Sequence, residues 1–448
     1  MRPGSFLRSE RAREYGALAA RIGVLIGSRF GGSVLTLLYT LLIARIATPA
    51  DFGLAMLGLS WALLGSIPLS LNVESGSVKY LVAYARSGEP GKSSGFLRFN
   101  LLLLCASAGL VVAGAGLALA AGWIDAGTVG GRVALLAALT APVEAMARVY
   151  GRHATALDQV LRGSLPRMLV RPAFFCLVLG GVWLAGLRIG ADTVMGLFLL
   201  AALLTTGLQT WLLRRTFGFA RQAAPDMSER ATWMRTGLML APLLLMRENL
   251  KNVIVATAGV VLAKPEVGLL ALSLSVLSIV IFAVKAVDIA VSPRLSKAIQ
   301  HDRPRQVRSY LGASAAVKLV GTVLGLAAIA VLGDRVLGAF GAEFTAAHGA
   351  VLILFAIPAA DAVFGPTDMV LNVTGNRASI LAVSVGSFAA LVAGTAIGGT
   401  LGGLEGAAWG AAIPYALQQL VLCLQCHRQA GIDPSLLGVL ALVRDRRG

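Results

Sequence analysis

Long apolar stretches recur along almost the whole chain, and they constrain its fold more than any other feature. A helix that crosses the ~30 Å hydrocarbon core of a bilayer needs about 20 apolar residues. The sequence holds twelve such stretches, at roughly 22–44, 53–74, 98–121, 132–149, 168–187, 191–213, 236–262, 267–292, 312–332, 349–371, 379–400 and 404–425. We therefore predict an all-α, polytopic membrane protein with about twelve transmembrane helices.

The low fraction of charged residues supports this prediction. Charged residues make up 14% of the chain, whereas a soluble domain averages about 25%. So little charge cannot cover the surface of a soluble globule, which excludes a soluble enzyme. The connecting loops reach only about 20 residues, too few to fold as a catalytic domain, so any function must reside within the helices.

Basic residues are divided unevenly between the loops, and this predicts the orientation. With a cytoplasmic N-terminus, 29 of the 39 Lys and Arg residues fall in cytoplasmic segments, 5 in outer loops and 5 inside helices. Cytoplasmic loops carry such an excess in membrane proteins. We expect both termini to be cytoplasmic. We assign the net charge of +17 to loops that face anionic lipid, and expect no nucleic-acid partner.

A weak internal repeat relates the two halves of the chain. At an offset of 215 residues, residues 51–54 (DFGL) align with residues 266–269 (EVGL). The offset equals six predicted helices, as expected for a parallel repeat about an axis along the membrane normal. We predict two six-helix lobes, at residues 1–222 and 235–448.

Ionisable residues at membrane depth are the candidates for function. Each costs at least about 2.5–3.5 kcal/mol at a helix centre unless it faces a cavity or a partner. Arg247 lies near the middle of the stretch 236–262, and Lys251 follows one turn later on the same face. We predict that both face a hydrated cavity with Asn249 and Asn252. The alternative is a buried pair with a carboxylate from another helix. Glu248 lies about 100° round the helix from Arg247 and need not neutralise it.

Other ionisable residues leave alternatives open. Arg29 either lines the same cavity or extends to the cytoplasmic surface. Lys285 and Asp288, three residues apart, form an internal pair or contribute to the cavity. Asp361, after Pro358, carries a proton or cation or makes a structural hydrogen bond.

Two further residues have simpler interpretations. Arg148 is expected to pair with Glu144, four residues earlier on the same helix. Lys318 is expected to extend toward the membrane surface.

The sequence resembles the Wzx-type polysaccharide flippases of the multidrug/oligosaccharidyl-lipid/polysaccharide (MOP) exporter superfamily. Four segments carry the resemblance: residues 44–53 (ARIATPADFG), 292–296 (SPRLS), 371–377 (LNVTGNR) and 403–411 (GLEGAAWGA). Each segment is weak alone, but their order and spacing extend the resemblance over essentially the whole chain. The two additional helices of MurJ-type flippases are missing from the predicted twelve.

The resemblance implies a two-lobed transporter of the bacterial inner membrane that works by alternating access. Its implied substrate is a polyprenyl-diphosphate-linked oligosaccharide used to make surface polysaccharide such as lipopolysaccharide, with polymerase or glycosyltransferase machinery as possible partners. The basic residues fit a diphosphate independently. The candidate substrate-binding residues are Arg29, Arg247, Lys251, Lys285, Asn249 and Asn252. The candidates for ion or proton coupling are Glu248, Asp288 and Asp361.

Two rival functions remain. A drug pump of the same superfamily extrudes organic cations and favours acidic residues in its first helix, where this chain has Arg29. A membrane-embedded glycan polymerase or ligase usually needs a large outer loop. We expect no cofactor: Cys423, Cys426 and His427 spell a haem-attachment motif, but they lie at the predicted cytoplasmic end, on the wrong face for such a haem.

Overall fold

The computed structural model describes residues 24, 27–28, 30–218 and 223–436, with Arg247 and Arg377 described by their backbone alone. Every regular element in these ranges is a helix, and nine of the helices are long and apolar enough to cross a membrane. The chain is therefore a multi-pass, all-α membrane protein. The exact number of spans and the orientation of the termini stay predictions.

The first half begins with the helix Phe30–Ile46. The elements that follow it are α2 (Pro49–Leu69), η1 (Val73–Gly76), α3 (Ser77–Ser87), α4 (Pro90–Ala120), α5 (Val129–Ala156), α6 (Val160–Leu165), the π-helix η2 (Pro166–Val170), α7 (Arg171–Leu184) and α8 (Ala191–Leu213).

The second half begins with a helix in two pieces, α9 (Arg230–Glu248) and α10 (Leu250–Val261). After them come α11 (Lys264–Gln300), α12 (Pro304–Gly338), η4 (Ala342–Ala347), α13 (His348–Leu354), α14 (Ala356–Phe364), α15 (Thr367–Val373), α16 (Arg377–Gln425) and η5 (Cys426–Ala430).

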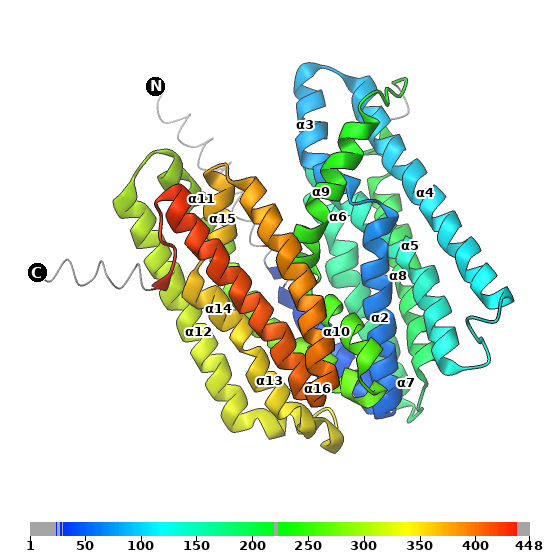
Figure 1. Ribbon diagram of the computed structural model, residues 1–448. Coiled ribbons are helices and arrows are strands. Elements are labelled where there is room, and N and C mark those ends of the chain that lie inside the picture. The colour runs from blue at the N-terminus through cyan, green and yellow to red at the C-terminus, as the bar shows by residue number, and fades with distance from the viewer. Residues whose placement is uncertain (1–23, 25–26, 29, 219–222, 437–448) are drawn as a thin grey trace, which may run out of the picture.

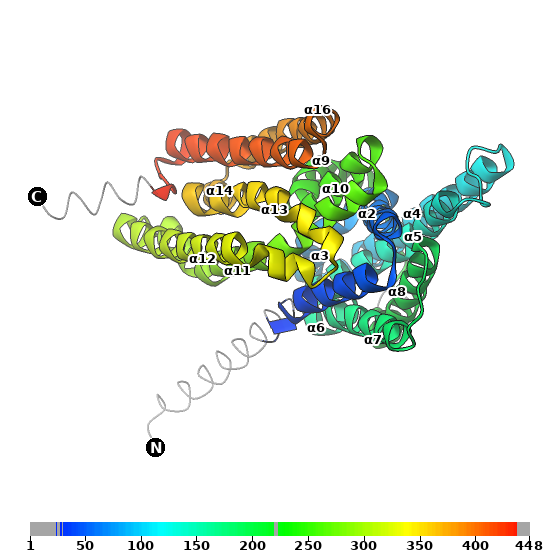
Figure 2. The same cartoon turned by 90° about the horizontal axis from the view of Figure 1, so that it is seen from below.

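The helices gather into two groups, visible side by side in Figure 1. In the first group α5 packs against both α2 and α8, and in the second α12, α13 and α14 pack around α11 and α16. Helix α4 diverges from the first group (Figures 1 and 2), and only 6% of its most apolar 18-residue stretch is buried inside the protein. Such an apolar and uncovered helix suits a lipid environment.

The two groups meet along α2, α10 and α11, at the predicted outer end. Gly53 of α2 lies so close to α11 that a Cβ atom there would stand 1.7 Å from the carbonyl oxygen of Lys264. Gly268 contacts Gly53 in return, and these two glycines are the positions that the 215-residue offset aligns. The predicted repeat of two six-helix lobes stays a prediction.

At the predicted inner end, α9 packs against η1 and α4 of the first group as well as against α16 of its own half (Figure 1). Trp233 is 0% exposed and lies against Phe96 of α4, with ring centroids 5.2 Å apart. Asn72 donates from its side-chain amide to the carbonyl of Gly237, over 3.1 Å. This segment of the second half is therefore attached to the first.

Most predicted stretches coincide with helices, and the differences have local causes. The stretch 53–74 ends early, at Leu69, because Leu71 and Asn72 adopt left-handed conformations (φ 46° and 57°) that a helix cannot continue. The stretch 236–262 is broken at Asn249. The stretches 379–400 and 404–425 form α16, whose two parts meet at non-helical Gly402 and Gly403.

Candidate functional site

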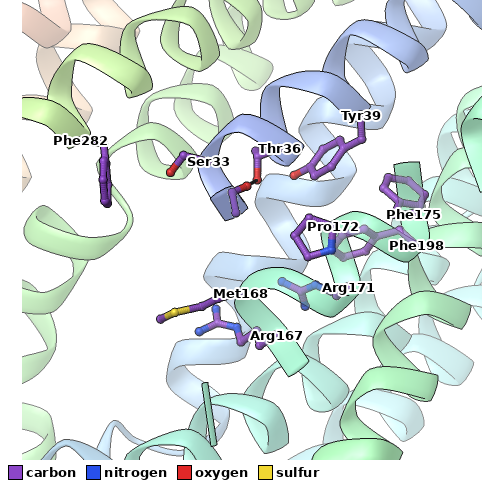
Figure 3. A pocket seen from close by; sticks show the side chains of 11 residues that line it. Ser33, Thr36, Tyr39, Arg167, Met168, Arg171, Pro172, Phe175, Phe198 and Phe282 are labelled. Carbon is purple, nitrogen blue, oxygen red and sulfur yellow. Dashed lines mark hydrogen bonds between the residues drawn. The ribbon is translucent and has the colours of Figure 1, made fainter. Parts of the chain in front are cut away.

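A polar and aromatic cavity of about 340 Å³ lies where the first helix, η2, α7 and α8 face α11. Figure 3 shows the side chains that line it. Its polar lining comes from Ser33, Thr36 and Tyr39 of the first helix and from Arg167 and Arg171 of the η2–α7 segment. Its apolar lining includes Phe175, Phe198 and Phe282. Phe282 belongs to α11, so both halves contribute to the cavity.

The local sequence explains why two arginines reach this place. Pro166 begins the five-residue π-helix η2, and Arg171 begins α7 directly after it. Arg167 and Arg171 are four residues apart, so both side chains leave on the same side of the segment. π-Helical turns are rare in proteins overall, and those that occur are often found at functional sites.

One carboxylate serves both arginines. Glu144 of α5 is 0% exposed and forms a hydrogen-bonded ion pair with Arg171. Its other oxygen lies 3.4 Å from Nε of Arg167. Arg167 remains 34% exposed, and Figure 3 shows its guanidinium beside Met168, at the open side of the cavity. Two cations share one anion, which leaves Arg167 available to a negatively charged ligand.

Arg148 and Arg152 extend this cationic region along α5. Nε of Arg148 lies 2.8 Å from Glu74, and its guanidinium also donates to the Ser66 carbonyl over 2.6 Å. Arg152 pairs with Glu248 at 2.5 Å. The predicted pair of Arg148 with Glu144 is wrong, because α5 turns the two side chains toward different neighbouring helices.

The predicted cavity residues of the second half are only partly placed. Arg29 lies outside the described residues, as does the side chain of Arg247. Lys251 is half-buried and donates to the hydroxyl of Ser275 in α11 over 2.7 Å.

The two predicted asparagines lie next to the break between α9 and α10. Asn249 occupies the break itself, with φ −127° and ψ 15°. Asn252 donates to Asn249 over 3.4 Å and accepts from Ser60 of α2 over 3.5 Å. These amides therefore contribute to the contact between the halves.

The remaining predicted residues lie together inside the second group of helices. Asp288 is ion-paired with Lys318 of α12 at 2.5 Å. Asp361 is buried and accepts hydrogen bonds from Tyr415 and Gln419 of α16. Lys285 acts on both aspartates electrostatically. The prediction that Lys318 extends to the surface is wrong, since this side chain is 1% exposed.

The sequence analysis missed the arginines that the structure brings together. It counted Arg148, Arg152, Arg167 and Arg171 only among the basic residues of the cytoplasmic side, whereas α5 and the η2–α7 segment bring them together. Their spacing gave a signal, because each pair is four residues apart and extends the periodicity of the adjacent predicted helix. For metals, the described residues hold no group of three or more His, Cys, Asp or Glu side chains placed to bind an ion.

Comparison with solved structures identifies the fold. An inward-facing multidrug resistance MATE family transporter of the MOP superfamily matches with a TM-score of 0.72 at 12% identity, over 89% of this chain and 94% of that one. An outward-facing MATE family transporter of the MOP superfamily gives 0.58 at 14% identity, over 91% and 94%. The lipid II flippase MurJ, in an inward closed conformation, gives 0.62 at 12% identity, over 90% and 87%.

No family model matches the sequence, and no curated protein sequence matches it. The structural likeness therefore shows the fold alone, and it confirms the predicted MOP-type architecture. The two inward-oriented structures score higher than the outward-facing one.

Proposed function

We propose that this protein is a flippase that moves a polyprenyl-diphosphate-linked oligosaccharide across the bacterial inner membrane by alternating access. The observation that carries the proposal is the partly exposed guanidinium of Arg167 in a polar and aromatic cavity to which both groups of helices contribute. A cation at this depth is costly unless water or an anion accompanies it. A diphosphate supplies that anion.

The chemistry of the lining fits each part of such a substrate. Guanidinium groups bind phosphate oxygens through paired, charge-assisted hydrogen bonds. The hydroxyls of Ser33, Thr36 and Tyr39 suit the hydroxyl groups of a sugar, and the aromatic rings offer apolar faces for it. The polyprenyl chain stays in the surrounding lipid. Arg29, Arg247 and Lys251 remain predicted contributors.

The product would serve the synthesis of a surface polysaccharide, in the manner of a Wzx-type flippase. Polymerase and glycosyltransferase machinery would then act before and after transport. The MOP-type fold supports this proposal, because the MurJ flippase with the same fold is named for a lipid-linked substrate, lipid II.

Drug efflux is the second candidate, and the likeness to the inward-facing MATE transporter favours it. A pump for organic cations needs an available carboxylate in its cavity. The three carboxylates at this site, Glu74, Glu144 and Glu248, are each paired with an arginine. This pairing favours an anionic substrate.

The test is a flipping assay in proteoliposomes with a fluorescent polyprenyl-diphosphate disaccharide. Arg167→Ala should slow flipping at least about tenfold, since a hydrogen bond to a charged group contributes about 1.5–3 kcal/mol. Arg167→Lys should retain part of the rate, because the charge stays and the planar fork is lost.

The matched control is Arg162→Ala, which removes an exposed arginine from neighbouring α6 and should leave the rate unchanged. Flipping by Arg167→Ala at the wild-type rate would refute the assignment. Transport of ethidium by the wild-type protein, with no flipping of the lipid, would establish the efflux alternative instead.

A further inference from the structure

Glu248 differs from the other acidic residues of the arginine cluster. It belongs by sequence to the second half, where it is the last residue of α9, yet its carboxylate pairs with Arg152 of α5 at 2.5 Å. Arg167 and Arg148 also lie close enough to act on it electrostatically. A negative charge from one half thus occupies the positive region of the other.

The three carboxylates of the cluster differ in exposure. Glu74 is 1% exposed and Glu144 is 0% exposed, so each is fixed inside the first group of helices. Glu248 is 47% exposed, and its partner Arg152 is 38% exposed. An ion pair that is open to water is weak and easily exchanged. Glu248 is therefore the carboxylate that an incoming anion can replace.

The charges of the cluster favour this exchange. Four arginines (Arg148, Arg152, Arg167 and Arg171) face three glutamates while Glu248 is in place, and two glutamates once it has left. A diphosphate brings at least two negative charges and several acceptor oxygens, so it restores neutrality and binds guanidinium groups better than one carboxylate does.

The position of Glu248 links this exchange to the backbone. Asn249 breaks the helix directly after it, and α10 then continues along α2 and α16. The pair with Arg152 thus fastens the junction of α9 and α10 to the first group of helices. Loss of the pair removes that attachment at the point where the helix is already interrupted.

We propose that Glu248 is a resident anion that occupies part of the substrate's diphosphate site, and that substrate binding displaces it and releases the α9–α10 junction from α5. The proposal rests on the proposed function, since it requires a diphosphate ligand. It also restricts the substrate class, because four arginines and two glutamates leave an excess of two positive charges, which a ligand with a single negative charge does not neutralise.

The experiment measures binding of farnesyl diphosphate and of farnesyl methyl phosphate, a phosphodiester with a single negative charge, to the full-length protein in nanodiscs. Wild type should bind the diphosphate more tightly than the phosphodiester. Glu248→Gln should bind the diphosphate about threefold to tenfold more tightly than wild type, since the competing ion pair is gone. Glu343→Gln is the control: it removes one exposed negative charge from η4, far along the chain, and should leave binding unchanged.

A second measurement separates displacement from a general effect of charge. Spin labels at Thr155 of α5 and Leu238 of α9, both exposed, report the separation of these helices once the native cysteines are replaced. Diphosphate should shift the wild-type distances toward those that Glu248→Gln shows without ligand. A purely electrostatic role would leave the distances unmoved.

The outcomes distinguish the two proposals. If wild type binds the diphosphate, but Glu248→Gln changes neither affinity nor distances, the resident-anion proposal is refuted and the proposed function stands. Equal tightening in Glu343→Gln would also refute it. If wild type binds no diphosphate at all, both proposals fail.

Discussion

At the scale of single residues, the buried ionisable side chains among the described residues are paired between helices rather than along one helix. Arg148 pairs with Glu74, Arg171 with Glu144 and Lys318 with Asp288, each from a different helix. A pair four residues apart on one helix would often face lipid, where both charges lose hydration. A pair between helices is shielded by protein, and each charge then depends on its partner.

This dependence gives a prediction for Lys318, the buried cation of the second group. Lys318→Met should destabilise the protein by about 3–5 kcal/mol, because it leaves Asp288 as a partly buried charge without its 2.5 Å partner. The measurement is the thermal unfolding midpoint in detergent. The double variant Lys318→Met/Asp288→Asn should recover most of the loss.

Lys297→Met is the control for Lys318→Met, since Lys297 is an exposed lysine near the end of α11. It should change the midpoint little. A single Lys318→Met variant as stable as wild type would show that the ion pair contributes nothing to the fold.

At the scale of elements, the decisive feature is a broken helix whose two pieces, α9 and α10, contact different parts of the first group. Helix α9 is anchored on the first group by Trp233, whose Nε1 donates to the Tyr84 hydroxyl over 2.9 Å. That hydroxyl donates to Glu229 over 2.6 Å. Burial and the bond to Glu229 raise the pKa of Tyr84 to about 12, so the phenol stays protonated and keeps donating at physiological pH. Helix α10, after the break, packs on α2, and both α9 and α10 also contact α16.

The anchoring predicts the effect of Trp233→Ala. The change removes a 0% exposed side chain and its hydrogen bond, so α9 should detach from α4 more often while α10 stays packed. Hydrogen–deuterium exchange should accelerate in residues 230–248 and change little in 250–261. Trp183→Ala, at a 51% exposed tryptophan in α7, is the control. Uniform acceleration over both segments would contradict an independent α9.

At the scale of the whole molecule, the two groups of helices are in contact where α2 meets α11. The cationic cavity lies nearer the other end of the molecule. The closed end depends on close backbone approach, since Gly53 and Gly268 leave no room for side chains. Phe52 and Phe344 add an edge-to-face ring contact there, with centroids 5.1 Å apart. An alternating-access cycle would have to separate this contact in its outward-facing state.

Gly53→Val should therefore shift the protein away from this arrangement. A Cβ at Gly53 would stand 1.7 Å from a backbone oxygen, which cannot move like a flexible side chain. Spin labels on α2 and α11 at the predicted outer end should report longer distances than in wild type. Gly196→Val in α8, where a Cβ would meet nothing within 4 Å, should leave the distances unchanged. Unchanged distances in Gly53→Val would mean that the glycine contact does not hold this end closed.

The sequence by itself determined that the chain is embedded in a membrane and where most of its helices lie. Each apolar stretch is long enough to span lipid, and a helix is the structure that satisfies its own backbone there. The resemblance to MOP exporters also predicted the fold correctly. These features depend on local composition and order along the chain, which the sequence states directly.

Only the tertiary structure decided which charges meet. Uniformly apolar helices have no polar face, so their sequence does not reveal which side turns inward. The rotation of α5 about its axis decides which neighbours its side chains meet. In the structure Arg148 meets Glu74, whereas the sequence predicted a pair with Glu144. The meeting of Glu248 with Arg152 depends on a helix break and on the packing of α9 across the halves. Both are set by contacts between segments almost a hundred residues apart, which no local pattern encodes.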